Sequence, residues 1–361
     1  MNWKRKATLA TLALLTSAAQ GRSAQMNAGS APPAPAGIAV ELNPLRQTLG
    51  KSDDVLVTVT LANHASAIQY LLAWQTPLAG VAAPLFDVTR DGQAVPYLGI
   101  QAKRAAPAPA DYLALAPGAS RSVTVELSKL YDMSVTGAYS VRYRTGALQQ
   151  FSAPGVTVGQ AATAGFAGAI WIDGRLPRGT LPAVNVPAAP AGLSYSRCSN
   201  AQQDSIAGAV DAAQAMALDG SAYMSRRALG PRYASWFGAF DDARASAIVD
   251  HFRAIGEAFA TRPVTVDCGC NESYYAYVYP SQPYKIYVCK AFWSAPLSGT
   301  DSKGGTLVHE MSHFTVVAAT EDWVYGQSAA AKLALSDPAK AVGNADSHEY
   351  FGENTPHQEL R

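Results

Sequence analysis

The pattern His309-Glu310-Met311-Ser312-His313 has the plainest chemical meaning of any segment in this sequence. On a helix, residues i and i+4 lie on one face, so His309 and His313 can hold one metal ion. Glu310 follows the first histidine and can take a proton from a water molecule as a general base. We therefore expect metal-assisted hydrolysis with one catalytic Zn²⁺ ion; the competing interpretation is a pair of core histidines.

A catalytic zinc ion usually has a third protein ligand. One known extension of the pattern needs a glycine three residues after the second histidine and another histidine three residues further on. This extension is excluded, because Val316 and Ala319 stand at those positions. Asp322 is a nearby carboxylate downstream, and Glu349 and Glu353 are more distant ones. The residues alone leave these alternatives open.

Two segments around these residues resemble a known family. The segment 305–314 reads Gly-Thr-Leu-Val-His-Glu-Met-Ser-His-Phe, and 320–326 reads Thr-x-Asp-x-x-Tyr-Gly. Both are similar to motifs of the aspzincin, or deuterolysin, metalloendopeptidases. The second motif of that family begins with a glycine where this chain has Ala319, a position that shapes a turn. The resemblance implies that Asp322 is the third zinc ligand and that Tyr325 hydrogen-bonds the oxyanion.

Within this family the sequence is most similar to the peptidyl-Lys metalloendopeptidases, through residues 193–361. The resemblance includes Asn-Ala-Asp-Ser-His-Glu-Tyr-Phe at 344–351. It implies that Asp346 and Glu349 line the S1′ pocket, which receives the residue after the scissile bond, and that cleavage occurs on the N-terminal side of Lys. The i,i+3 spacing puts both carboxylates on one face of a helical turn. Without the resemblance, an ordinary solvated helix face is the alternative.

Two other functions remain open. The protein could be a broad-specificity deuterolysin-like protease in which Asp346 and Glu349 point elsewhere. It could also be a non-catalytic secreted zinc-binding or adhesive protein, although the intact Glu310 argues against this. The other histidines show no ligand spacing, and we interpret them as surface or core residues: His64, His251, His348 and His357.

The elements that position these residues are predicted to be mainly helical. Residues 199–218 are alanine-rich with apolar residues at helical spacing, and 241–259 carry an apolar stripe. Residues 274–288 alternate and are broken by Pro-Ser-Gln-Pro, which predicts a β-hairpin. We therefore expect a mainly helical zincin catalytic domain with a small β-hairpin or sheet over 193–361.

The residues before this domain are predicted to form four segments. Residues 1–19 have a basic start and an apolar stretch shorter than the ~20 residues of a membrane helix, which indicates a signal peptide and a secreted protein. Residues 20–37 read as a flexible leader. Residues 38–151 predict an all-β, immunoglobulin-like sandwich, because short alternating runs are separated by turn residues. The Gly/Ala/Pro-rich segment 152–192 reads as a linker and activation segment, so the fold class is α+β.

The family resemblance implies that the N-terminal half is a pro-domain, so that the protein is made as a zymogen and its own pro-domain inhibits it. No lysine lies between Lys129 and Lys285. An enzyme that cuts strictly before lysine therefore could not release itself within the linker. We expect either a separate activating protease, near Arg175 or Arg178, or a less strict self-cleavage.

The cysteines predict disulfide bonds. There are four, all in the C-terminal half: Cys198, Cys268, Cys270 and Cys289. An even number in an exported chain favours two disulfides over a zinc site. A bond between the two cysteines at 268 and 270 is disfavoured geometrically, which leaves two pairings. The family resemblance implies Cys198–Cys268 and Cys270–Cys289.

Composition excludes several function classes. The chain has 28 Lys and Arg against 27 Asp and Glu, so a nucleic-acid partner is not expected. With 48% hydrophobic and 15% charged residues, the chain is not globally disordered. We expect a monomer without a membrane span, whose substrates are proteins or peptides.

Overall fold

The computed structural model describes residues 37–358, except 51, 145, 147, 164–165, 167, 174–191 and 227–228. The predicted signal peptide, nearly all of the leader and most of the second half of the predicted linker lie outside the described residues. Pro35–Arg361 is one compact unit, and the elements below all belong to it.

The N-terminal half is built from strands in which burial alternates along the chain. In β3 (Leu56–Asn63) every second residue is buried, because neighbouring side chains of a strand point to opposite faces of the sheet. β1 (Ile38–Pro44) and β9 (Ser120–Glu126) pair antiparallel with β3, and β13 (Ala162–Thr163) pairs in parallel with β1. This sheet has the order β13-β1-β3-β9.

Two further sheets complete this half. Their strands are β2 (Thr48–Leu49), β4 (Gln69–Leu72), β5 (Phe86–Arg90), β6 (Gln93–Ala94), β8 (Tyr112–Leu115), β10 (Gly137–Tyr143), β11 (Gln149–Ala153), β12 (Val156–Gln160) and β14 (Ile170–Ile172). One sheet has the order β2-β14-β10-β5-β6 and the other β12-β11-β4-β8. Their buried aliphatic and aromatic side chains share one hydrophobic core with those of β1 and β3.

Part of the segment predicted as a linker is strand. β12, β13 and β14 all lie within residues 152–172 and pair with strands of the N-terminal half. Ile170 and Ile172 are buried on either side of an exposed Trp171, an alternation too short to stand out in a Gly/Ala-rich stretch. All of β12 is exposed, so its hydropathy carries no signal.

The C-terminal half is mainly helical, which confirms the predicted α+β class. Its helices are α1 (Asn200–Met224), α2 (Pro231–Phe237), α3 (Asp242–Thr261), α4 (Lys290–Ser294), α5 (Lys303–His313), α6 (Gln327–Ser336), α7 (Pro338–Val342) and α8 (Ala345–Glu353). Side chains of Ser199, Asp241 and Ser302 accept hydrogen bonds from the first turns of α1, α3 and α5, which explains where these helices begin. No helix among the described residues is both long enough and apolar enough to cross a membrane.

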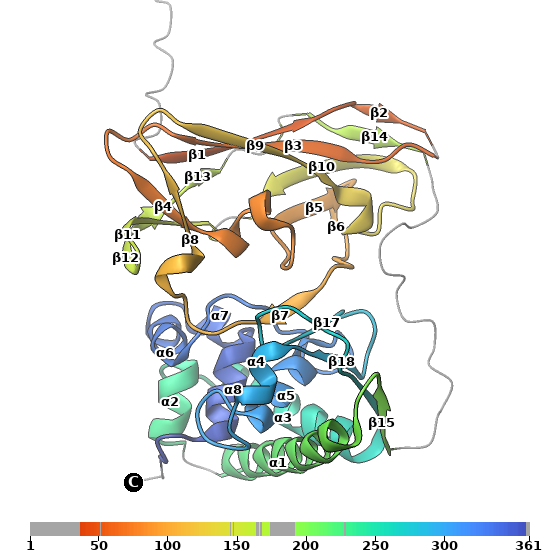
Figure 1. Cartoon of the computed structure of the whole chain (residues 1–361), viewed down its shortest axis with the longest axis vertical. Helices are drawn as coiled ribbons and strands as arrows, with labels where there is room; N and C mark the ends of the chain where they lie inside the picture. The colour runs from red at the N-terminus through yellow and green to blue at the C-terminus, as the bar shows by residue number, and fades with distance from the viewer. Residues whose placement is uncertain are drawn as a thin grey trace, which may run out of the picture. The chain divides into compact units, whose positions relative to one another are not determined.

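One sheet belongs to the C-terminal half but takes its last strand from the N-terminal half. Its order is β15 (Gly192–Ser196), β16 (Pro263–Asp267), β18 (Lys285–Val288), β17 (Ala276–Val278) and β7 (Gln101–Lys103). The antiparallel β17–β18 pair is the predicted hairpin. Figure 1 shows β7 beside β17, where Lys103 faces Ala276 and Ala102 faces Tyr277 in antiparallel register.

Two disulfides tie the helical half together. Cys198, just before α1, is bonded to Cys268, just after β16, and Cys270 is bonded to Cys289, which directly follows β18. This is the pairing that the family resemblance implied.

Candidate active site

Helix α5 carries the two histidines of the His-Glu-x-x-His pattern and is buried from Gly304 to its end. Two glycines allow this burial. A Cβ atom on Gly304 would lie 2.9 Å from Cβ of Ala212 in α1, and one on Gly305 would lie 2.1 Å from a carboxylate oxygen of Glu353 in α8. Helix α5 is therefore held between α1 and α8 at a distance that larger residues would not allow.

The rings of His309 and His313 present one nitrogen each towards Asp322. Nδ1 of His313 donates to the carbonyl oxygen of Thr320 at 2.9 Å, which leaves Nε2 as the free acceptor nitrogen. Oδ1 of Asp322 lies 3.1 Å from Nε2 of His309 and 3.4 Å from Nε2 of His313. The structure thus brings together the three residues predicted as metal ligands.

These three side chains fit a metal ion. All three are buried, and the nitrogens and carboxylate oxygens that face one another have no hydrogen-bond partner among the described residues. Their candidate ligand atoms lie within 4.8 Å of one another. Buried polar atoms without partners are costly, and two imidazoles with a carboxylate are a ligand set that zinc accepts.

Asp322 and Tyr325 lie in a loop, residues 319–326, that is tied to both neighbouring helices. Its first residue, Ala319, has a φ of 50°, in the left-handed region where the family motif has glycine. The amide of Thr320 donates to the carbonyl oxygen of Ser312 in α5. These contacts direct the loop back across the C-terminal end of α5.

The same loop is bonded to the start of α8. The side-chain oxygen of Asn344 accepts from the amides of Trp323 and Val324 at 3.1 and 3.2 Å. Oδ2 of Asp346 accepts from the amide of Gly326 at 2.6 Å. The position of Asp322 therefore depends on α8 as well as on α5.

The electrostatics of the buried groups agree with a cation site. Burial raises the pKa of Glu310 to about 7, although His309 and His313 pull it down. Burial also raises the pKa of Asp322, but the two imidazoles lower it more, so the net pKa lies well below its usual range. Burial lowers the pKa of His309, and Asp322 outweighs this and raises it well above its usual value. The negative charge of Asp322 thus favours a positive charge between it and the histidines.

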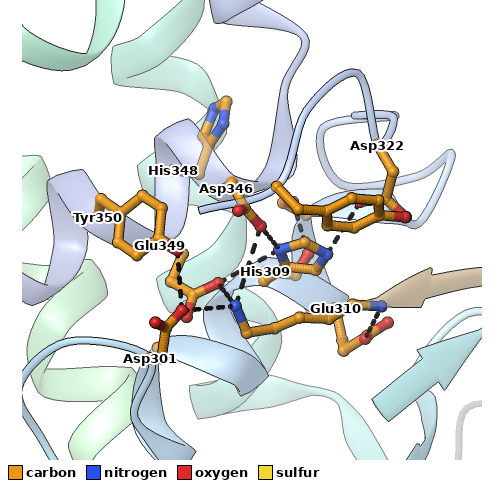
Figure 2. Close-up of polar contacts among 12 residues, drawn as sticks. Asp301, His309, Glu310, Asp322, Asp346, His348, Glu349 and Tyr350 are labelled. Carbon is orange, nitrogen blue, oxygen red and sulfur yellow. Dashed lines mark hydrogen bonds and ion pairs between the residues drawn. The ribbon is translucent and has the colours of Figure 1, made fainter. Parts of the chain in front are cut away.

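Asp346 and Glu349 lie on one face of α8, and a lysine ammonium is held between them. Nζ of Lys103, from strand β7, is 2.6 Å from Oε2 of Glu349 and 3.9 Å from Oδ1 of Asp346. A third carboxylate, Asp301, is 3.3 Å from the same nitrogen. Figure 2 shows Asp301 and Glu349 converging from two segments of the chain, with Asp346 beside them. The Lys103 side chain is fully buried in this pocket.

The lysine in this pocket is charged. Burial lowers the pKa of Lys103, but Glu349, Asp346 and Asp301 raise it more, so that it ends well above its usual value. The ammonium also lies 5.0 Å from the centre of the Tyr275 ring, a distance at which the ring face attracts a cation.

His309 lies between the two acidic groups (Figure 2). Its Nε2 faces Asp322, while its Nδ1 is 2.9 Å from Oδ1 of Asp346 and 3.3 Å from Oε2 of Glu349. A carboxylate behind a ligand histidine orients the ring and raises its basicity. His309, Asp346 and Glu349 could hold a metal themselves, but the cation in that group is the ammonium of Lys103.

The backbone of β7 contacts both residues expected to take part in the chemistry. The hydroxyl of Tyr325 donates to the carbonyl oxygen of Ala102 at 2.9 Å. The amide of Lys103 donates to Oε1 of Glu310 at 3.3 Å. Burial and the nearby Asp322 raise the pKa of Tyr325 well above its usual value, so its hydroxyl stays a donor. The Ala102–Lys103 peptide bond thus lies between Tyr325 and Glu310.

The remaining candidates have structural roles. The carboxylate of Glu353 accepts hydrogen bonds from the amide and hydroxyl of Ser302, both at 2.8 Å. It belongs to neither of the groups of described residues around His309 that could hold a metal ion. His348 is buried: its Nδ1 donates to the carbonyl oxygen of Asn344 and its Nε2 accepts from Nδ1 of His251, both at 2.9 Å. Burial, together with His251, lowers the pKa of His348 to about 3.

Sequence reasoning missed two members of the lysine pocket. Asp301 directly precedes the residue that caps α5 and has no motif of its own. Lys103 lies 207 residues before Glu310, in a half of the chain with no catalytic pattern. Only the absence of lysine from the predicted linker hinted that a lysine elsewhere in the N-terminal half could matter.

The chain is similar in sequence to known metalloendopeptidases. The aspzincin M35 family model, described as lysine-specific metallo-endopeptidase, matches residues 222–353. An extracellular protease of Aeromonas hydrophila is 48% identical over 312 residues, which cover 85% of this chain and 90% of that protein. A peptidyl-Lys metalloendopeptidase of Armillaria mellea is 35% identical over 288 residues, covering 76% of this chain and 79% of that protein.

A solved structure, the zinc peptidase from Grifola frondosa, is 45% identical to the part of this chain that it matches. It covers 45% of this chain and 100% of its own length, with a TM-score of 0.44.

Proposed function

Because this chain belongs to the aspzincin M35 family of zinc metalloendopeptidases, we propose that it is a secreted endopeptidase, made as a proenzyme, that cleaves proteins on the N-terminal side of lysine. The observation that carries the lysine preference is the buried ammonium of Lys103 among three carboxylates, one residue from a carbonyl oxygen held by Tyr325. Secretion is supported by the signal-peptide pattern and by the extracellular relative.

We assign the zinc ligands as Nε2 of His309, Nε2 of His313 and the carboxylate of Asp322. Their unpaired, buried and convergent atoms support this assignment. A zinc ion bound there would supply Lewis acidity and lower the pKa of a water molecule towards ~7. Thr320 and Asp346 hold the two rings in position from behind, through His313 Nδ1 and His309 Nδ1.

Glu310 and Tyr325 act on the two ends of the scissile peptide bond. Glu310 is placed to accept a proton from the attacking water and to return it to the leaving amine, because its carboxylate lies against the amide of the residue in the lysine pocket. The hydroxyl of Tyr325 donates to the carbonyl oxygen, where negative charge develops in the transition state. Both groups are buried, which strengthens these interactions.

The lysine pocket selects by charge and by shape. Each carboxylate attracts an ammonium by about 4 kcal/mol at ~4 Å and an effective dielectric constant of ~20, and desolvation of the ammonium offsets much of this. A surplus of only about 1.4 kcal/mol still gives about a tenfold preference over neutral residues. A guanidinium is larger and planar, so a pocket closed around a compact ammonium disfavours arginine.

A digest of an unrelated denatured protein by the activated enzyme tests this function. Every new N-terminus is read by mass spectrometry, with and without a zinc chelator. We expect new termini that begin with lysine and that disappear with the chelator. Chelator-sensitive cuts without lysine preference would favour a broad-specificity protease, and the absence of any cut would favour a zinc-binding protein without catalysis.

A further inference from the structure

Strand β7 lies in the active site in the manner of an extended substrate. It pairs antiparallel with β17, the neighbouring strand of the catalytic sheet, and the amide of Tyr275 donates to the carbonyl oxygen of Lys103 at 3.1 Å. Nε2 of Gln101 donates to the carbonyl oxygen of Thr320 at 3.3 Å. Addition of a strand to a sheet edge is a common way of binding an extended peptide.

The contacts on either side of the Ala102–Lys103 peptide bond place this bond where a substrate bond would be cut. Lys103 fills the acidic pocket, its amide faces Glu310, and the carbonyl oxygen of Ala102 accepts from Tyr325. A segment that only blocked the site would need none of these three contacts to coincide. Here all three fall on the Ala102–Lys103 bond.

We propose that Gln101–Lys103 is the enzyme's own first substrate and that the Ala102–Lys103 bond is cut by the active site in which it lies. The inference rests on the proposed function, since it uses the same pocket and the same catalytic groups. Until the cut, the buried Lys103 excludes other lysine side chains from the pocket, so the segment is also what keeps the proenzyme latent.

The step is a hydrolysis. The oxygen of one water molecule bonds to the carbonyl carbon of Ala102, and the bond from that carbon to the nitrogen of Lys103 breaks. Glu310 takes a proton from the water and passes it to the nitrogen of Lys103, which leaves as an amine. Water is the only co-reactant, so the products are a carboxyl terminus at Ala102 and an amino terminus at Lys103.

The cut does not separate the two pieces of the pro-domain. Strand pairs connect them across the cut bond: β3 with β9, β4 with β8 and β5 with β10. The cut instead gives the segment between β6 and β8 two free ends. One end stays connected to β6 and the other to β8, and both can leave the active site. The first product is therefore a nicked, two-piece protein, and a linker without lysine is no obstacle to this first step.

The full-length chain and its Glu310→Gln variant are compared by intact mass and N-terminal analysis under native and denaturing conditions. We expect the wild-type chain to yield a piece that begins at Lys103 and that co-elutes with its N-terminal partner in native gel filtration. We expect Glu310→Gln to stay intact at this bond. All four cysteines lie in the C-terminal piece, so denaturation alone separates the two pieces.

Substitutions of the lysine provide the matched comparison. Lys103→Ala and Lys103→Arg should slow this cut at least tenfold. Lys129→Ala should behave as wild type, because Lys129 is in the same half but its side chain is 64% exposed and pairs with Glu126. Should Lys103→Ala fail to fold because three carboxylates lose their cation, Lys103→Arg still supplies the comparison.

Amine labelling of the Glu310→Gln chain tests the docked segment without relying on activity. We expect Lys103 to resist acetylation while Lys129 is labelled. Labelling of both lysines would overturn this inference. So would a wild-type chain that stays uncut at Lys103 while its activated form cuts before lysine in denatured proteins. Either result would leave the proposed function standing. No lysine-directed cut in any substrate would contradict the proposed function itself.

Discussion

Two acidic clusters share His309, and they differ in the cation they are built for. On one side, His309, His313 and Asp322 have buried atoms without hydrogen-bond partners among the described residues. On the other side, Asp346 and Glu349 surround an ammonium from Lys103. The composition of the clusters is similar, so composition alone does not say which is a metal site. The presence of a protein cation in the second cluster makes the difference.

The clusters also differ in how they are assembled. The first takes two members from a single helix and the third from a loop nine residues further on. The second combines α8 with Asp301 and with a strand of the N-terminal half. The candidate metal site is therefore local and lies in the C-terminal half alone, while the occupied pocket also takes a residue from the N-terminal half. A cation that is part of the chain can be removed by cleavage, whereas the proposed metal ligands remain.

The largest effect is expected from loss of the metal cluster. Asp322→Ala should release zinc and lower kcat/KM by about three to four orders of magnitude, because several kcal/mol of transition-state stabilisation depend on the ion. Elemental analysis measures the zinc content of the variant, and hydrolysis of a lysine-containing peptide measures its kcat/KM. The exposed Asp250→Ala is the control. A stoichiometric zinc content in Asp322→Ala would show that the first cluster is not the metal site.

Smaller effects are expected from the two carboxylates of the second cluster, and the effects should differ between Asp346 and Glu349. Asp346→Asn removes pocket charge and also weakens the support of His309, so both kcat/KM on lysine peptides and zinc affinity should fall, each by about 10–100-fold. Glu349→Gln should lower the preference for lysine over neutral residues by about tenfold and change zinc affinity less, since its oxygen lies farther from His309. Equal losses of zinc affinity in both variants would contradict this division.

The pH dependence of stability should reveal His348, the buried histidine of α8. The unfolded chain binds a proton at His348 below about pH 6.5, whereas the folded chain resists protonation down to about pH 3. The unfolded state therefore binds more protons in this window, so stability falls as the pH drops from 6.5 towards 3. Between pH 7 and pH 5 this histidine should cost about 2 kcal/mol.

Urea unfolding at pH 7 and pH 5 tests this in the Glu310→Gln background, which prevents self-cleavage. His348→Gln should lose less stability than the parent chain over this interval, while the exposed His64→Gln should behave as the parent. The same pH sensitivity in His348→Gln would show that other groups account for it.

The smallest effect concerns the turn at Ala319. An L-residue in the left-handed region costs about 1–2 kcal/mol, and the greater flexibility of glycine in the unfolded chain offsets part of this gain. Ala319→Gly should therefore raise the free energy of unfolding by up to about 1 kcal/mol, measured from the urea midpoint. Ala318→Gly, one residue earlier, should not stabilise the protein. A destabilised Ala319→Gly would contradict the strain argument.

Much of the catalytic half could be predicted because its signals are local. The i,i+4 histidines lie on a helix whose start is encoded by a serine cap, and the pair Asp346 and Glu349 lies on α8 with the expected i,i+3 spacing. The hairpin over 274–288 was also readable from its alternation. The strands inside the predicted linker were not readable, because segments of two to five residues are too short for periodicity to appear.

The sequence by itself determined the family, the α+β class and the residue types of the candidate metal cluster, because these depend on spacing within a few turns of chain. Only the tertiary structure decided which cation fills the second cluster and which peptide bond lies at Glu310. Those answers come from pairing between β7 and β17, far apart in the sequence. Such pairing is selected by the fit of whole surfaces, and no local pattern at Lys103 encodes it.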